Sequence, residues 1–137
     1  MPFTFPIRVY WEDTDAGGIV FYANYLKFFE RARTEWLRNL GIEQQKLRDE
    51  VGGMFVVTHA EINYLKPARL DDVIEVTAVL EAAGRASITI SQQAFLKPLS
   101  SEPTPQLLCE GSIRIGWVDS TTMRPARIPK SIVEQLS

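Results

Sequence analysis

A lone amphipathic helix near the N-terminus leaves this chain few possible folds. At 100° per residue, residues 23–40 place a wide apolar and aromatic stripe on one side of a helix and cations opposite, and Gly41 ends the pattern. The stripe comprises Tyr22, Tyr25, Leu26, Phe29, Ala32, Trp36 and Leu40. At 1.5 Å per residue this stripe is about 27 Å long. A second layer of structure must therefore cover it.

Five strand-like segments can supply that layer. They are rich in β-branched and aromatic residues, and they comprise Phe3–Trp11, Phe55–Tyr64, Val73–Leu80, Ala86–Leu96 and Leu107–Val118. The order predicts an α+β fold in which a single curved antiparallel sheet of about five strands wraps one long central helix. We expect residues 1–137 to form one domain. The open edges of such a sheet favour association with another copy.

The connections between these elements also have recognisable signals. Residues 43–51 predict one or two helical turns that end at Gly52 and Gly53, and Ala82–Arg85 predicts a tight hairpin connection. The proline- and serine-rich segment Pro98–Pro105 predicts a loose loop at another hairpin end. A short helix is expected over Pro129–Leu136 because proline is tolerated in a first helical turn.

Composition excludes several classes of function. The net charge of −2 provides no general basic field, so we expect no nucleic-acid partner. The single cysteine, Cys109, excludes an internal disulfide and a cysteine-rich metal site, and its apolar strand pattern predicts a buried hydrophobic residue. The N-terminus has no signal-peptide pattern and no apolar run is long enough to span a membrane. We therefore expect a cytoplasmic protein.

The loop before the helix carries the chemically most suggestive residues. Asp13 and Asp15 stand immediately before Gly17-Gly18, which lead into the helix. The free backbone N–H groups and the positive dipole end of a helix N-terminus favour developing negative charge. A carboxylate beside such donors is the layout of an acyl-transfer site. We expect Asp15 to be catalytic, with an ordinary loop or capping acid as the alternative. For Asp13 we expect a structural role in holding the loop or pairing with a base.

Other polar residues give weaker signals. His59 alternates within a strand and is expected to be a hydrogen-bonded sheet residue. Its isolation argues against a zinc site, and no Gly-x-Ser-x-Gly motif or serine-histidine pair supports a catalytic triad. Arg33 falls inside the apolar stripe of the helix. We expect its aliphatic stem to pack while its guanidinium reaches solvent or pairs with an acid. The alternative is that it orients Asp13 or Asp15.

Several motifs together resemble one family, the hot-dog-fold acyl-CoA thioesterases that include 4-hydroxybenzoyl-CoA thioesterase. The resemblance rests on Asp-Thr-Asp-Ala-Gly-Gly-Ile-Val at 13–20 with Tyr22 and Tyr25, and on Phe-Glu-Arg-Ala-Arg-Thr-Glu at 29–35. Residues 64–72 and 124–133 are more similar to the bacterial Tol-Pal-associated branch. The match covers nearly the whole chain and implies a hot-dog fold. It also implies the hydrolysis of acyl-CoA thioesters with short-to-medium aliphatic or aromatic acyl groups.

The resemblance implies roles for individual residues. Asp15 corresponds to the essential carboxylate, acting as nucleophile or general base, and the backbone N–H of Tyr22 to the donor that polarises the thioester carbonyl. It also marks Gly18, Val20 and Tyr25 as residues that position the substrate. One departure is that Tyr22 stands where several Tol-Pal-associated members have histidine, which leaves the acyl-chain preference open.

The resemblance also implies an assembly. Two subunits would pair their sheets edge to edge, giving a homodimer or homotetramer, and coenzyme A would lie along the subunit boundary. Its phosphates would contact Arg85 and Lys66. No metal and no cofactor is expected, since coenzyme A is part of the substrate. Any link to the Tol-Pal envelope system rests on the resemblance alone. Two alternatives remain open, a hot-dog dehydratase and a non-catalytic protein that binds acyl-CoA or an acyl carrier or assists assembly.

Overall fold

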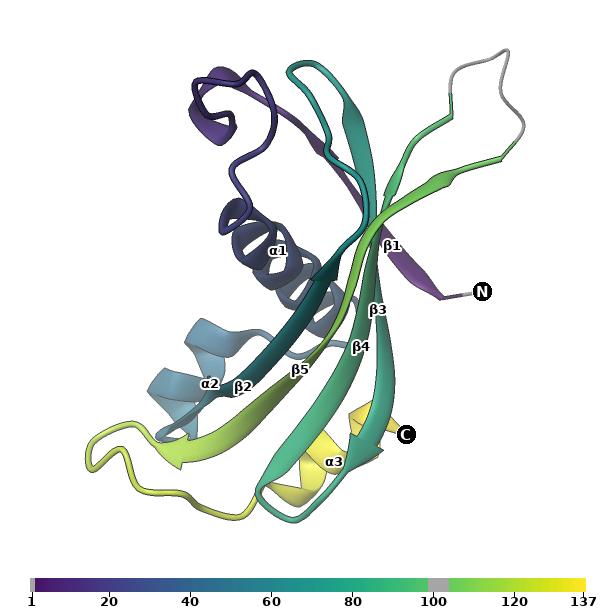
Figure 1. The fold of residues 1–137 in the computed structure, drawn as a ribbon. Coiled ribbons are helices and arrows are strands. Elements are labelled where there is room, and N and C mark those ends of the chain that lie inside the picture. Colours follow the sequence, from purple (N-terminus) through teal and green to yellow (C-terminus); the bar gives the residue numbers. More distant parts are fainter. Residues whose placement is uncertain (1, 99–103) are drawn as a thin grey trace.

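A computed structural model describes residues 2–98 and 104–137, and it contains one curved antiparallel sheet (Figure 1). The strands lie in the order β1-β3-β4-β5-β2, and each neighbouring pair is antiparallel. Their bounds are β1 (Phe3–Arg8), β2 (Gly53–Tyr64), β3 (Val73–Ala83), β4 (Ser87–Leu96) and β5 (Gln106–Asp119). The helices are α1 (Asn24–Asn39), α2 (Gln44–Glu50) and α3 (Lys130–Leu136). The predicted α+β class and the five-stranded sheet are therefore confirmed.

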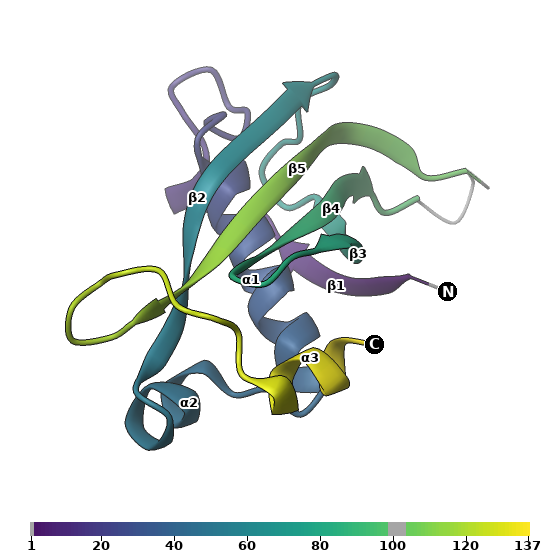
Figure 2. The same ribbon diagram turned by 90° about the horizontal axis from the view of Figure 1, so that it is seen from below.

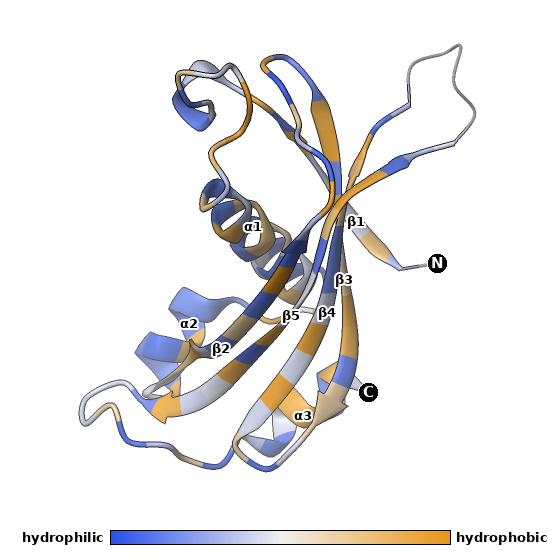
Figure 3. Cartoon of the chain, viewed as in Figure 1, coloured by the Kyte–Doolittle hydropathy of each residue, from blue (hydrophilic) through white to orange (hydrophobic). Residues whose placement is uncertain are grey.

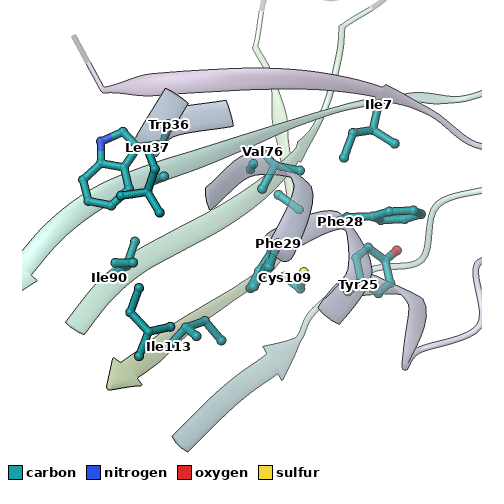
Figure 4. Packing of buried hydrophobic residues seen from close by; sticks show 14 of the residues in the cluster. Ile7, Tyr25, Phe28, Phe29, Trp36, Leu37, Val76, Ile90, Cys109 and Ile113 are labelled. Atoms are coloured by element: carbon teal, nitrogen blue, oxygen red, sulfur yellow. The ribbon is translucent and has the colours of Figure 1, made fainter. Parts of the chain in front are cut away.

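The long helix α1 lies against the concave face of the sheet, as two views at right angles show (Figures 1 and 2). Its buried residues face alternate residues of the strands, because side chains of a strand point to its two faces in turn. Figure 4 labels Phe28 and Phe29 of α1 with Val76, Ile90 and Ile113 of the sheet, and all five belong to one core and are fully buried or nearly so. Most strands show alternating hydrophobic and hydrophilic bands, whereas α2 is largely hydrophilic (Figure 3).

The buried face of α1 differs from the predicted stripe. Phe28 and Leu37 are buried, whereas Leu26 is 44% exposed and Tyr22, just before the helix, is 62% exposed. The difference in burial arises from the position of the helix on the sheet. The helix lies closest to β1 and β3, so Phe28 and Leu37 are enclosed. The side of α1 that carries Leu26 faces a groove along β2.

The surroundings of Arg33 also differ from those predicted. The residue is only 7% exposed, and its guanidinium donates to Oε1 of Gln92 at 3.0 Å. Within the described ranges, Arg33 forms no ion pair, so its head does not pair with an acid; it reaches the surface only where it lines a groove along β2. It does not orient Asp13 or Asp15 either, since backbone amides hold both carboxylates. The sequence could not show that a buried glutamine from β4 would meet this arginine.

The observed boundaries of some elements differ from the predicted ones by a few residues. β1 ends at Arg8 rather than at Trp11, because the chain turns into a short 3-10 helix, η1 (Trp11–Asp13). The β3–β4 turn occupies residues 84–86, where the Gly84 amide donates to the Ser87 carbonyl at 2.7 Å. The predicted loop Pro98–Pro105 lies largely outside the described residues. None of the helices in the described part of the chain has the length and hydrophobicity needed to cross a bilayer.

Two connections meet at one end of the sheet. The loop before α1 forms isolated bridges from Val20 to Thr14 and from Ile19 to Arg69, so it lies beside the β2–β3 connection. The β3–β4 turn and α3 lie at the other end (Figure 1). This arrangement brings the predicted catalytic loop next to the end of β2.

Candidate active site

Asp15 begins a tight turn, and its amide, carbonyl and carboxylate all form hydrogen bonds that close this turn. Its backbone amide donates to the Ile19 carbonyl at 2.9 Å, and its carbonyl accepts from the Gly18 amide at 3.0 Å. The Gly17 amide donates to Oδ1 of its side chain at 2.8 Å. Gly18 has φ of +80°, a backbone conformation that favours glycine. These bonds fix an exposed carboxylate whose second oxygen, Oδ2, accepts no hydrogen bond from the described residues.

Asp13 has the structural role that was predicted for it. Its buried carboxylate accepts a hydrogen bond from the Tyr10 amide at 2.9 Å. Its carbonyl accepts from the Phe21 amide at 2.9 Å and from the Asn24 side-chain amide at 2.8 Å. Because Asn24 is the first residue of α1, these bonds tie the loop to the start of the helix.

The start of α1 offers free backbone donors. The amides of Asn24, Tyr25 and Leu26 donate to carbonyls one turn earlier. For the amides of Tyr22 and Ala23, by contrast, the described residues provide no acceptor. Such N–H groups at the positive end of a helix dipole can bind an oxygen that gains negative charge. The Tyr22 N–H expected from the resemblance is therefore available.

Aromatic rings form the wall beside these donors. The ring of Tyr64, at the end of β2, lies 5.9 Å from that of Tyr22 and 5.8 Å from that of Tyr25, measured between centroids. The Tyr25 hydroxyl accepts from the Ala68 amide at 3.2 Å. Burial raises the pKa of Tyr25 to about 12, so this phenol is neutral near pH 7 and positions the β2–β3 connection. Sequence reasoning missed Tyr64 as part of this wall. The only feature of the sequence that pointed to Tyr64 was its position as an aromatic residue at the end of a predicted strand.

Comparison with known proteins decides the family. The model of the thioesterase-like superfamily matches residues 9–136. This chain belongs to the thioesterase-like superfamily. Among curated thioesterase-like relatives, the acyl-CoA thioesterase YbgC of Haemophilus influenzae is 41% identical over 95% of this chain and 90% of its own length. The acyl-CoA thioester hydrolase YbgC of Escherichia coli is also 41% identical, over 97% of this chain and 94% of its own length.

The fold agrees with this assignment to the thioesterase-like superfamily. A crystal structure of a hypothetical protein from Aquifex aeolicus has a TM-score of 0.87 and 34% identity, and the match covers 99% of this chain and 100% of that one. The predicted hot-dog fold and thioesterase family are therefore confirmed. The individual site residues remain predictions that rest on their geometry.

Two predicted positioning residues of this thioesterase-like chain have amides that are already bonded. The Val20 amide donates to the Ala68 carbonyl at 2.9 Å, and the Gly18 amide donates to Asp15. Val20 is buried and anchors the loop to the β2–β3 connection. Their contribution is therefore to shape the loop that carries Asp15.

The two basic residues predicted to bind coenzyme A lie far apart. Lys66 is exposed just after β2, at the same end of the sheet as Asp15, and its amide donates to the Leu108 carbonyl at 3.0 Å. Arg85 is exposed in the β3–β4 turn, at the opposite end (Figure 1). A single chain therefore does not bring Arg85 and Asp15 together.

His59 and Cys109 have the roles predicted from their strand patterns. The His59 ring is exposed on β2 and lies 3.0 Å from Oε1 of Glu61. Cys109 is buried in the core (Figure 4), and burial raises the pKa of its thiol to about 12. Neither residue therefore offers a nucleophile or a base at the loop.

Proposed function

We propose that this protein hydrolyses acyl-CoA thioesters to a free acid and coenzyme A. The observation that carries the proposal is the fixed, exposed carboxylate of Asp15 on the loop that leads directly into the free amides at the start of α1. Membership of the thioesterase-like superfamily and the acyl-CoA thioesterases at 41% identity support it. The acyl groups we propose are short-to-medium aliphatic or aromatic ones.

The proposed chemistry needs one carboxylate and no cofactor. The thioester oxygen accepts a hydrogen bond from the Tyr22 amide, which stabilises the negative charge of the tetrahedral intermediate. In one route Asp15 takes a proton from water as the water oxygen bonds to the carbonyl carbon. In the other, Asp15 attacks the carbon itself and gives a mixed anhydride that water then cleaves. In both routes the C–S bond breaks and coenzyme A leaves as a thiolate.

We further propose that the working enzyme is a homodimer or homotetramer. Strand β2 lies at the edge of the sheet, and within the described residues no strand pairs with its outer side. Exposed strand edges favour pairing with another copy. Coenzyme A would lie along the boundary between copies, with its phosphates contacting Arg85 and Lys66. A second copy explains how a basic residue so far from Asp15 in one chain could serve the same site.

We also propose a cytoplasmic location and a link to the Tol-Pal envelope system. A cytoplasmic location fits the composition of the sequence. A link to the Tol-Pal envelope system follows only from the resemblance of residues 64–72 and 124–133 to that branch of the family.

A panel of acyl-CoA substrates tests the proposed activity. The purified protein should release free coenzyme A, measured with a thiol-reactive dye, from at least one short-to-medium aliphatic or aromatic thioester. An absence of release from the whole panel, together with measurable binding of acyl-CoA, would favour a non-catalytic binding protein instead. Hydration of an unsaturated acyl thioester in place of hydrolysis would favour a dehydratase.

A further inference from the structure

A groove of about 530 Å³ runs between α1 and β2, outside the loop that carries Asp15. Its apolar walls are formed by Leu26 of α1, Val57 and Ala60 of β2 and Ile113 of β5. Four charged residues of α1 also line it, and of these Lys27, Glu30 and Arg31 are exposed whereas Arg33 is buried. A smaller cavity of about 140 Å³ adjoins it and shares Glu30, Arg33 and Val57 with it. The groove exists because α1 lies closer to β1 and β3 than to β2. An apolar groove with a few polar groups is typical of a ligand site.

One buried cation, Arg33, lines this groove. Arg33 lines both cavities although the residue is only 7% exposed. Its guanidinium donates to Oε1 of Gln92, which is fully buried. The Gln92 amide nitrogen in turn donates to the Phe29 carbonyl of α1 at 3.0 Å and to the Thr77 carbonyl of β3 at 3.2 Å. These bonds hold Gln92 in one orientation, so its oxygen faces Arg33.

The charge of Arg33 is incompletely compensated. Glu30 is the acid whose charge acts on Arg33, but it makes no ion pair with it in the described part of the chain. Glu30 is exposed and accepts a hydrogen bond from the Thr34 hydroxyl at 3.3 Å. A guanidinium carries five N–H donors, and the Gln92 oxygen accepts from only one of its nitrogen atoms, Nη1. No buried side-chain nitrogen or oxygen in the described residues lacks a partner, so the other donors of Arg33 are accessible where it lines the two cavities. Burying such a cation is costly unless an anion or a strong acceptor meets it.

The groove is aligned with the proposed reaction centre. Tyr22, Leu26, Glu30 and Arg33 follow one another at spacings of four, four and three residues, so they lie along one side of the helix. At 1.5 Å per residue, Tyr22 and Arg33 are roughly 16 Å apart along the axis. The Arg33 side chain leans toward the helix N-terminus and shortens this span. A medium-length acyl chain held by its thioester at Tyr22 can therefore extend past Leu26 toward Arg33.

From this alignment we propose that Arg33 is a specificity-determining residue, which selects acyl groups with a hydrogen-bond-accepting oxygen, above all a carboxylate, at their far end. The inference rests on the proposed function, because it assigns the acyl part of that substrate to the α1–β2 groove. The apolar walls bind the methylene chain, and the terminal carboxylate supplies the ion-pair partner that Arg33 lacks in the described residues. The preferred substrates are then monothioesters of medium-length dicarboxylic acids.

Matched substrate pairs test this specificity. We expect the wild-type protein to hydrolyse adipoyl-CoA at least as efficiently as hexanoyl-CoA, or suberoyl-CoA at least as efficiently as octanoyl-CoA, judged by kcat/KM. In Arg33→Met, which keeps an apolar side chain of similar length, the dicarboxylyl-to-monocarboxylyl ratio should fall by about 10- to 100-fold, the effect of losing a hydrogen bond to a charged group. Both substrates are measured on one preparation, so a partly inactive sample leaves the ratio unchanged.

Two further variants keep the test decisive. Arg33→Lys retains a cation and should give an intermediate ratio, and it serves in place of Arg33→Met if that variant does not fold. Arg38→Met removes an exposed arginine of the same helix and should leave the ratio at the wild-type value. An unchanged ratio in both Arg33 variants would overturn the inference while leaving the proposed hydrolysis intact. A wild-type protein that hydrolyses none of the four substrates, nor any other acyl-CoA, would remove both proposals.

Discussion

At the scale of single residues, the proposed reaction depends on one carboxylate oxygen of Asp15. Asp15→Asn removes the negative charge but keeps an oxygen that can accept from the Gly17 amide, so the turn should persist. We expect kcat for acyl-CoA hydrolysis to fall at least about 100-fold, the contribution of a positioned acid–base group. Steady-state kinetics on the best substrate of the panel would measure it.

A neighbouring acid provides the control for this experiment. Glu12 is exposed in η1, three residues earlier, and Glu12→Gln removes one negative charge from the same loop. Its kcat should stay within a few-fold of wild type. If the folded Asp15→Asn variant keeps a kcat comparable to that of Glu12→Gln, Asp15 is not the catalytic group and the loop serves only to shape the site.

At the scale of elements, Gly111 lets β2 approach β5 closely. It pairs with Ile62 of β2 and Gln92 of β4, and an added Cβ would lie 2.3 Å from the Glu61 carbonyl oxygen. The backbone must shift to accept it, so we expect Gly111→Ala to reduce the free energy of unfolding by about 1–3 kcal/mol. Urea denaturation measures the change.

Gly84 is the matched glycine for comparison. In the β3–β4 turn a Cβ at this position would meet the Ser87 carbonyl oxygen at 3.4 Å, an ordinary contact. Gly84→Ala should therefore change the free energy of unfolding by less than about 1 kcal/mol. Equal losses in the two variants would mean that close strand approach at Gly111 is not what requires glycine.

Elements could be predicted from the sequence where the signal is local. The alternation of Ile113, Ile115 and Trp117 and the helical spacing of Tyr25, Phe29 and Trp36 each follow from one segment, and the structure confirms all of them as buried.

The orientation of α1 on the sheet could not be predicted in this way. Whether Leu26 or Leu37 is enclosed depends on how close the helix lies to β1 and β3, which are distant in sequence. The meeting of Arg33 and Gln92 is likewise a contact between segments that no pattern encodes.

Some residues of the candidate site could likewise be predicted from one local segment, whereas others are brought to the site only by the fold. The loop 12–23 is one continuous segment, so its acids, glycines and helix entry could be read together, and the structural role of Asp13 followed from its place there. Tyr64 and Ala68 join the site only because the β2–β3 connection folds back against that loop. Their contribution became visible only with the fold.

At the scale of the whole molecule, the separation of Asp15 and Arg85 makes a prediction about assembly. If coenzyme A lies along a boundary between copies, Arg85 of one copy serves the Asp15 of another. Arg85→Ala should then mainly raise KM, because phosphate contacts are made equally in the ground and transition states. Light scattering should give a dimer or tetramer, and a clean monomer would contradict a shared site.

Mixing the two defective proteins distinguishes a shared site from one built within a chain. Asp15→Asn and Arg85→Ala are each poorly active at substrate concentrations well below the raised KM. In a dimer with shared sites, each mixed dimer contains one site with both defects and one with neither. Random exchange of equal amounts makes about a quarter of all sites intact for a twofold-symmetric pair. Activity should therefore rise well above the mean of the separate variants after subunit exchange. Sites built within one chain would give that mean and no more, since every chain then carries its own defect.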